Sequence, residues 1–88
     1  MDGGLYPGPI NQLNISTLNM IEVFKTNVVK QSQAKTVLKI LQENFNDFKV
    51  NFDLADCDKV LRVQGTSISP EEIIKLVNAT GYQCEVLD

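Results

Sequence analysis

The sequence predicts an α+β sandwich in which two helices cover one face of a four-stranded antiparallel sheet. Two observations lead to this fold class: two segments repeat apolar residues at helical spacing, and four short segments have the composition or the alternation of strands. The 88 residues, 43% of them hydrophobic, are enough for one such domain. Every apolar run is far shorter than the ~20 residues of a membrane span, so we expect a soluble chain with no membrane partner.

The first half of the domain is predicted as strand, helix and strand. Residues 18–25 are rich in β-branched and aromatic side chains, which favour a strand. Within residues 31–44 the apolar side chains recur at every third or fourth position, so they form one stripe on a helix. Residues 48–54 alternate apolar and polar side chains, as a strand with one buried and one wet face does.

A second helix is indicated by the segment 69–72. Ser69 can cap the amide of Glu72 while the Glu72 side chain reaches back to Ser69. Pro70 stands at the first helical position, where its missing N–H costs nothing. Gly81 readily adopts the left-handed conformation that ends many helices, so we expect the helix to end there.

Two more strands flank this helix. Residues 60–63 resume strand character and stop at Gly65, and residues 82–86 alternate apolar and polar side chains. The predicted order is therefore βαββαβ. Right-handed crossovers then place the strands in the order 4-1-3-2 with both helices on one face, which is the ferredoxin-like arrangement.

Residues 1–17 differ in composition from the rest, because they hold three of the five glycines and two of the three prolines. Such a segment buries little and has many backbone torsions to fix, so we expect a flexible arm over residues 1–17 and the folded domain over residues 18–88. The first residues lack the cationic and apolar regions of a secretory signal, which favours a cytoplasmic chain.

Charge and composition narrow the function classes. Eight Lys and Arg against eleven Asp and Glu give a net charge of -3, so there is no basic surface for nucleic acid. The chain has no His, which removes the commonest general base and the commonest neutral metal ligand. We therefore expect neither an enzyme nor a nucleic-acid-binding protein.

Six segments of the chain carry a resemblance to a known family, and they are Ile21–Phe24, Ala34–Val37 with Leu38 and Leu41, Phe48–Leu54, Val60–Gly65, Ser69–Ile74 and Gly81–Leu87. Over residues 20–88 these elements resemble the heavy-metal-associated domain of copper chaperones and of the amino termini of metal-transporting ATPases. In that family a Met-Thr-Cys-x-x-Cys segment before the first helix binds Cu(I) or Zn through two thiolates, since soft sulfur selects those ions.

The cysteine pair of that family is missing from this chain. If Ala34 and Val37 anchor the alignment, the two cysteine positions hold Lys30 and Gln33. Neither side chain replaces a thiolate, and Lys30 brings positive charge to the place of the cation. The resemblance thus implies a degenerate member with a vacant metal site, and we expect no cofactor.

The two cysteines of the chain lie elsewhere. Cys84 shares a strand face with Tyr82 and Val86, which predicts a free thiol packed in the core. Cys57 lies in the turn between the second and third strands. The sheet order puts the two thiols near opposite edges, beyond disulfide reach.

Three acidic residues, Asp53, Asp56 and Asp58, lie close to Cys57 in the sequence. In the predicted topology this turn shares one end of the domain with the loop around Lys30. A cluster of carboxylates and a thiol, above all Asp56, Cys57 and Asp58, could attract a divalent cation, whereas acids in a hairpin are more often only a solvated turn.

The leading hypothesis is a non-catalytic module that acts through an unidentified protein partner. The interaction surface that we predict consists of Val28, Val29, Lys30 and Tyr82. Tyr82 matches the tyrosine that shields the metal loop in bacterial members of the family, and Lys30 with Lys35 offers positive charge to an acidic partner. Edge strands also recruit partners, so a homodimer through an edge of the sheet is expected as well.

Two alternatives stay open. The first is a Cu or Zn carrier in which Cys57 and the neighbouring carboxylates replace the lost pair. The second is a regulatory domain of the same topology that senses a small ligand at the loops between helices and strands.

Overall fold

The computed structural model describes residues 20–87, which form the six elements that the sequence predicts, in the predicted order. The expected arm, residues 1–17, lies outside the described residues, as do the first two residues expected in the first strand. The elements are β1 (Met20–Thr26), α2 (Gln31–Asn44), β2 (Lys49–Asp53), β3 (Val60–Gly65), α3 (Pro70–Ala79) and β4 (Cys84–Val86).

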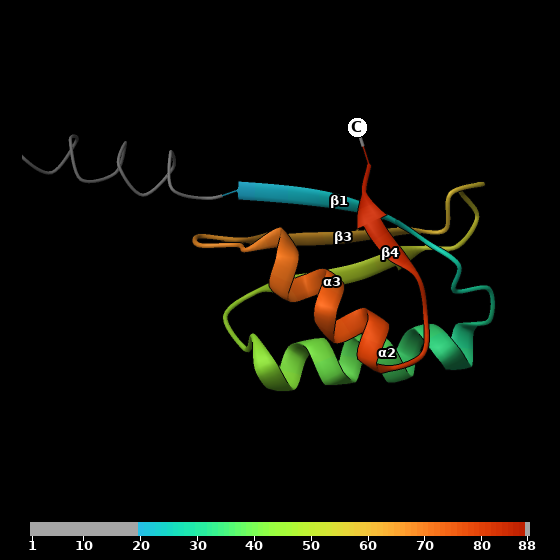
Figure 1. Cartoon of the computed structure of the whole chain (residues 1–88), viewed down its shortest axis with the longest axis horizontal. Coiled ribbons are helices and arrows are strands. Elements are labelled where there is room, and N and C mark those ends of the chain that lie inside the picture. The colour runs from blue at the N-terminus through green and yellow to red at the C-terminus, as the bar shows by residue number, and fades with distance from the viewer. Residues whose placement is uncertain (1–19, 88) are drawn as a thin grey trace, which may run out of the picture.

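The four strands form one antiparallel sheet in the order β2-β3-β1-β4, which confirms the predicted ferredoxin-like topology. Both helices lie on the same side of this sheet (Figure 1). The apolar stripes of the helices and the apolar face of the sheet meet in a single core, and its largest fully buried side chains are Phe24, Leu41, Leu61, Ile73, Val28, Val37, Val63 and Val77.

Helix α2 has the predicted bounds, whereas two strands are shorter than expected. β2 stops short of Phe48 and Leu54, whose carbonyls accept bonds from the side chains of Gln42 (2.7 Å) and Lys59 (3.0 Å). β4 begins only at Cys84 and has three residues. The apolar alternation thus predicts these two strands but not the residues at which they end.

The predicted reciprocal cap of α3 is wrong. No side chain caps this helix, and the Ser69 hydroxyl instead donates to the Glu71 carboxylate at 3.3 Å. The Glu72 amide bonds to the Ser69 carbonyl at 3.1 Å, and Pro70 is the first helical residue as expected. Gly81 follows the helix with φ at 102°, the left-handed conformation that was predicted for it.

Within residues 20–87, neither helix has the length and the apolar character of a membrane span.

Candidate functional site

Three connections meet at one end of the sheet, as the topology predicts. The Thr26 amide donates to the Asp58 carbonyl at 3.0 Å, which joins the end of β1 to the β2–β3 hairpin. The Gln83 amide donates to the side-chain oxygen of Asn27 at 2.8 Å, which joins the α3–β4 connection to the same end of β1. The connections are residues 27–30, 54–59 and 80–83.

The β1–α2 loop, where the resemblance places the metal-binding cysteines, is held by side-chain oxygens. The Val28 amide donates to the Thr26 hydroxyl at 3.2 Å. Gln33 accepts the amides of Val29 (3.3 Å) and Lys30 (3.1 Å) with one carboxamide oxygen. Three consecutive amides are thus satisfied within the chain, and Gln33 takes half the role of a capping box at the start of α2.

Lys30 is the residue that precedes α2, and its side chain is exposed. Its carbonyl accepts the first helical bond, from Ala34 at 3.0 Å. An ammonium group has no lone pair, so Lys30 can neither cap the helix amides nor bind a cation. Both positions expected for the cysteines therefore hold side chains that serve the fold or face solvent.

The predicted interaction surface needs one correction. Val28 is 0% exposed and belongs to the core, so it offers no surface to a partner. Val29, by contrast, is 61% exposed, the highest value among the exposed large hydrophobic side chains of the described residues. Tyr82 is partly buried against the core. The loop thus presents Val29 and Lys30 side by side, with Tyr82 contributing only in part.

Cys84 is a buried free thiol of the core, as predicted. Burial, with a smaller contribution from the charge of Glu85, raises the pKa of this thiol from 9.0 to about 12. At neutral pH the thiol is therefore protonated, the form that is the weaker nucleophile and the weaker metal ligand.

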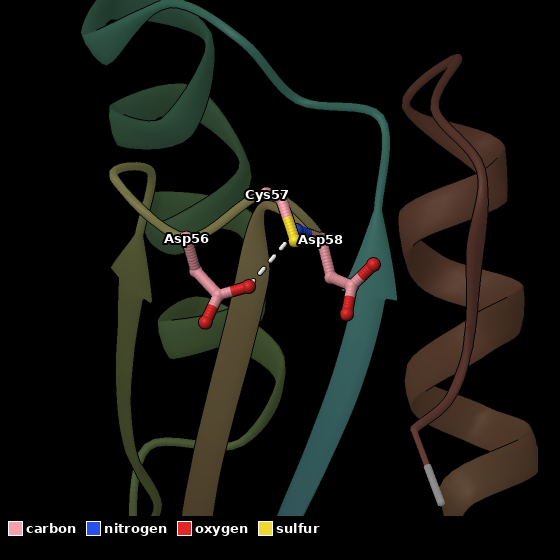
Figure 2. A group of neighbouring side chains, drawn as sticks. All are labelled: Asp56, Cys57 and Asp58. Carbon is pink, nitrogen blue, oxygen red and sulfur yellow. Dashed lines mark hydrogen bonds between the residues drawn. The ribbon is translucent and has the colours of Figure 1, made fainter.

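Cys57 is exposed and lies between two aspartates on the tip of the β2–β3 hairpin (Figure 2). The Cys57 sulfur and one carboxylate oxygen each from Asp56 and Asp58 lie within 4.8 Å of one another, so the predicted group of three forms. Asp53 does not belong to this group, because it lies in β2 opposite Val60.

Both carboxylates of this group have other partners. Asp56 accepts the Asp58 amide at 2.9 Å with its side chain and the Lys59 amide at 3.0 Å with its carbonyl, which builds the turn. Lys59, the residue after Asp58, has the left-handed backbone conformation, with φ at 48°. The Asp58 carboxylate lies 4.0 Å from the Lys25 ammonium. The cluster thus has the geometry of a shared ligand set and, equally, of a self-contained hairpin turn.

A small hollow opens between the ends of β1 and β4. Its volume is about 50 Å³. The residues that line it are Lys25, Thr26, Gln83, Cys84 and Glu85. This space is well below the roughly 300–1,000 Å³ of typical sites for small molecules.

Thr26 is the residue at this end that the sequence does not single out. It is only 7% exposed, and its hydroxyl donates to the Lys59 carbonyl at 2.6 Å while accepting the Val28 amide. One side chain therefore ties the hairpin to the loop. The available signal is a polar residue at an inward position of β1, two residues after Phe24.

No known family model matches the chain, and no curated protein sequence matches it.

Proposed function

We propose that this chain is a non-catalytic protein-interaction module, a divergent relative of heavy-metal-associated domains that no longer has their cysteine pair. The observation that carries the proposal is the exposure of Val29 on a loop whose backbone is fixed by Thr26 and Gln33. A preordered loop loses little conformational entropy when a partner binds it. Burying an exposed apolar side chain then contributes directly to the affinity.

The charge next to Val29 points to the chemistry of the partner. Lys30 and Lys35 are both exposed, near the beginning of α2. Cations at this position favour a partner with acidic side chains around an apolar spot, because opposite charges across an interface raise the association rate and set specificity.

The test compares two variants with matched exposure. Val29→Asp places a charge at the proposed contact, and Ile21→Asp places the same charge on β1, where Ile21 is 58% exposed. We expect a partner captured by cross-linking to be lost with Val29→Asp and retained with Ile21→Asp, and its capture to weaken with Lys30→Glu. Equal capture by the two aspartate variants, with thermal melts that show both folded, would contradict the proposal.

A metal carrier is the second candidate, and the specific observation in its favour is the proximity of Asp56, Cys57 and Asp58. The bonds that already occupy Asp56 and the cation beside Asp58 reduce the charge free for a metal. Titration with Cu(I) and Zn²⁺ under reducing conditions separates the candidates. Tight, saturable binding that Cys57→Ser abolishes would favour the carrier over the interaction module.

Small-ligand sensing has less support, since the hollow beside Thr26 has only about 50 Å³. Thermal-shift screening with amino acids tests it, and a stabilising ligand whose effect Gln83→Ala leaves unchanged would place the binding elsewhere.

A further inference from the structure

The outer edge of β2 is open among the described residues, because β2 pairs only with β3. The direction of its backbone groups follows from the ladder, since N–H and C=O point to the same side and alternate along a strand. The Leu87 amide bonds to the Val23 carbonyl on the β4 side of β1. Phe24 therefore points its backbone groups the other way, toward β3.

The same alternation carries through to β2. Leu61 lies opposite Phe24 and points back toward β1, so the next residue of β3, Arg62, points toward β2. Asn51 lies opposite Arg62 and faces β3. Val50 and Phe52 consequently direct their N–H and C=O groups away from the sheet, into the open edge.

The two ends of this edge are closed by the chain itself. The Phe48 carbonyl accepts the Gln42 side chain, and the Leu54 carbonyl accepts the Lys59 ammonium. The backbone groups left free for a new strand are therefore those of Val50 and Phe52. A second strand can form its backbone hydrogen bonds only at these two residues.

The side chains of β2 are complementary to a second copy of β2. The sequence of the strand is Lys-Val-Asn-Phe-Asp. If a second copy runs antiparallel about a twofold axis at Asn51, Lys49 of each copy faces Asp53 of the other, and Val50 of each copy faces Phe52 of the other. Both pairs occur twice, and opposite charges or apolar side chains directly across an antiparallel pair stabilise it.

The geometry of an antiparallel ladder agrees with this axis. Asn51 faces β3, so the axis would pass through a pair without backbone hydrogen bonds, where opposing side chains lie closest. Lys49 and Asp53 occupy the same type of position, which favours an ion pair. Val50 and Phe52 of the two copies would then exchange their free backbone bonds.

Apolar side chains near this edge are incompletely covered. Six of the nine partly buried apolar residues around the core belong to α2, to the turn after it, or to the segment 48–54, and they are Leu38, Phe45, Phe48, Val50, Phe52 and Leu54. α2 packs against β2. A second copy at the edge would cover part of this surface.

The opposite edge does not fit its own copy. β4 has three residues, with Glu85 at the centre. A twofold axis there would place Glu85 against Glu85 of the second copy, and like charges directly opposite each other destabilise a sheet. β2 is thus the edge whose charges suit self-association.

We propose that two copies of this chain associate through β2, antiparallel and about a twofold axis at Asn51, so that the two four-stranded sheets continue as one. The contact is a strand pair of five residues, so it belongs with the small and reversible interfaces. Association should therefore depend on concentration.

Charge reversal tests the proposed register by analytical ultracentrifugation. Lys49→Glu sets a carboxylate against Asp53 of the other copy, and Asp53→Lys sets an ammonium against Lys49, each twice in the dimer. We expect each variant alone to dimerise at least about tenfold more weakly than the natural chain, equal to about 1.4 kcal/mol. Lys75→Glu makes the same charge change on α3, and we expect it to dimerise like the natural chain.

Mixing the two variants is the decisive measurement. In a dimer of one Lys49→Glu chain and one Asp53→Lys chain, both facing pairs regain opposite charges. We expect the mixture to associate as strongly as the natural chain, a result that misfolding of either variant cannot produce. A natural chain that stays monomeric up to about 1 mM, or a mixture as weak as its components, would overturn the proposal.

Amide hydrogen exchange gives an independent readout on the natural chain. With rising concentration, exchange should slow at Val50 and Phe52, whose amides point into the open edge, and stay unchanged at Asn51, whose amide faces β3. Slowing confined to residues of β4 would assign self-association to the other edge and refute this one.

Discussion

The ring of Phe48 occupies the space that a side chain at Gly65 would need. A β-carbon built on Gly65 would meet the Cδ1 and Cε1 atoms of this ring, the latter at 2.7 Å. Phe48 also stacks on Phe45, with ring centroids 5.2 Å apart. The absence of a side chain at Gly65 therefore lets the turn after α2 pack against the end of β3.

Gly65→Ala should lower the free energy of unfolding by about 1–3 kcal/mol, because the added methyl group forces the Phe48 ring out of its position. Urea denaturation measures the change. The double variant Gly65→Ala with Phe48→Ala should lose less stability than the sum of the two single variants, since the clash is then absent. Additive losses would show that the ring is not the cause.

Thr26→Val should cost about 1–3 kcal/mol of stability, although the two side chains have nearly the same shape. The change removes the hydroxyl that donates to the Lys59 carbonyl and accepts the Val28 amide. Urea denaturation checks the loss, and the exchange rate of the Val28 amide should rise. Thr26→Ser keeps the hydroxyl and serves as the control. If the Thr26→Val variant is as stable as the natural chain, the Thr26 hydroxyl does not stabilise this end of the fold.

Stability should fall at alkaline pH through Cys84. Its pKa is about 12 in the folded chain, against 9.0 for an ordinary thiol, so the unfolded chain releases this proton first. The part of the free energy of unfolding that depends on the protonated Cys84 thiol is constant below pH 9.0. It is lost as the pH rises from 9.0 toward about 12. Chemical denaturation across this range, compared with Cys84→Ala, should show the steeper decline for the natural chain. Parallel curves would mean that Cys84 is not the group responsible.

The two thiols should differ in reactivity toward a soluble disulfide reagent. Cys57 is exposed and Cys84 is buried, so one thiol per chain should react fast and the second only as the chain unfolds. Absorbance kinetics measure both phases, and Cys57→Ser should remove the fast phase alone. A fast phase that persists in Cys57→Ser would mean that the β4 edge opens readily.

Most of the fold follows from the sequence, because periodicity records which face of each element is buried. The stripe in residues 31–44 predicts α2, and the order of the elements together with right-handed crossovers predicts the strand order of the sheet. The position of Val28 was also available: Phe24, Thr26 and Val28 continue one alternation, and all three are buried. Assigning Val28 to the surface followed the resemblance instead of the period.

The bonds at the site could not be predicted in the same way. Ser69 and Gln33 are both residue types that can cap the start of a helix. Only the Gln33 side chain bonds to backbone amides, whereas the Ser69 hydroxyl donates to the Glu71 carboxylate. Which partner a polar side chain takes depends on rotamers that neighbouring segments restrict, and these neighbours meet only in the folded chain. The topology, which the sequence predicts, brings the loops together. The hydrogen-bond partners within these loops depend on side-chain conformations that the sequence pattern does not predict.

The Thr26 hydroxyl has a practical consequence for following a partner in solution. Because it links the Lys59 carbonyl to the Val28 amide, the hairpin that carries Cys57 and the loop that carries Val29 are anchored to one residue. A fluorescent dye on the accessible thiol of Cys57 would lie at the same end of the sheet as the proposed contact without replacing any residue in it. The natural sequence thus already contains its own labelling position for a binding assay.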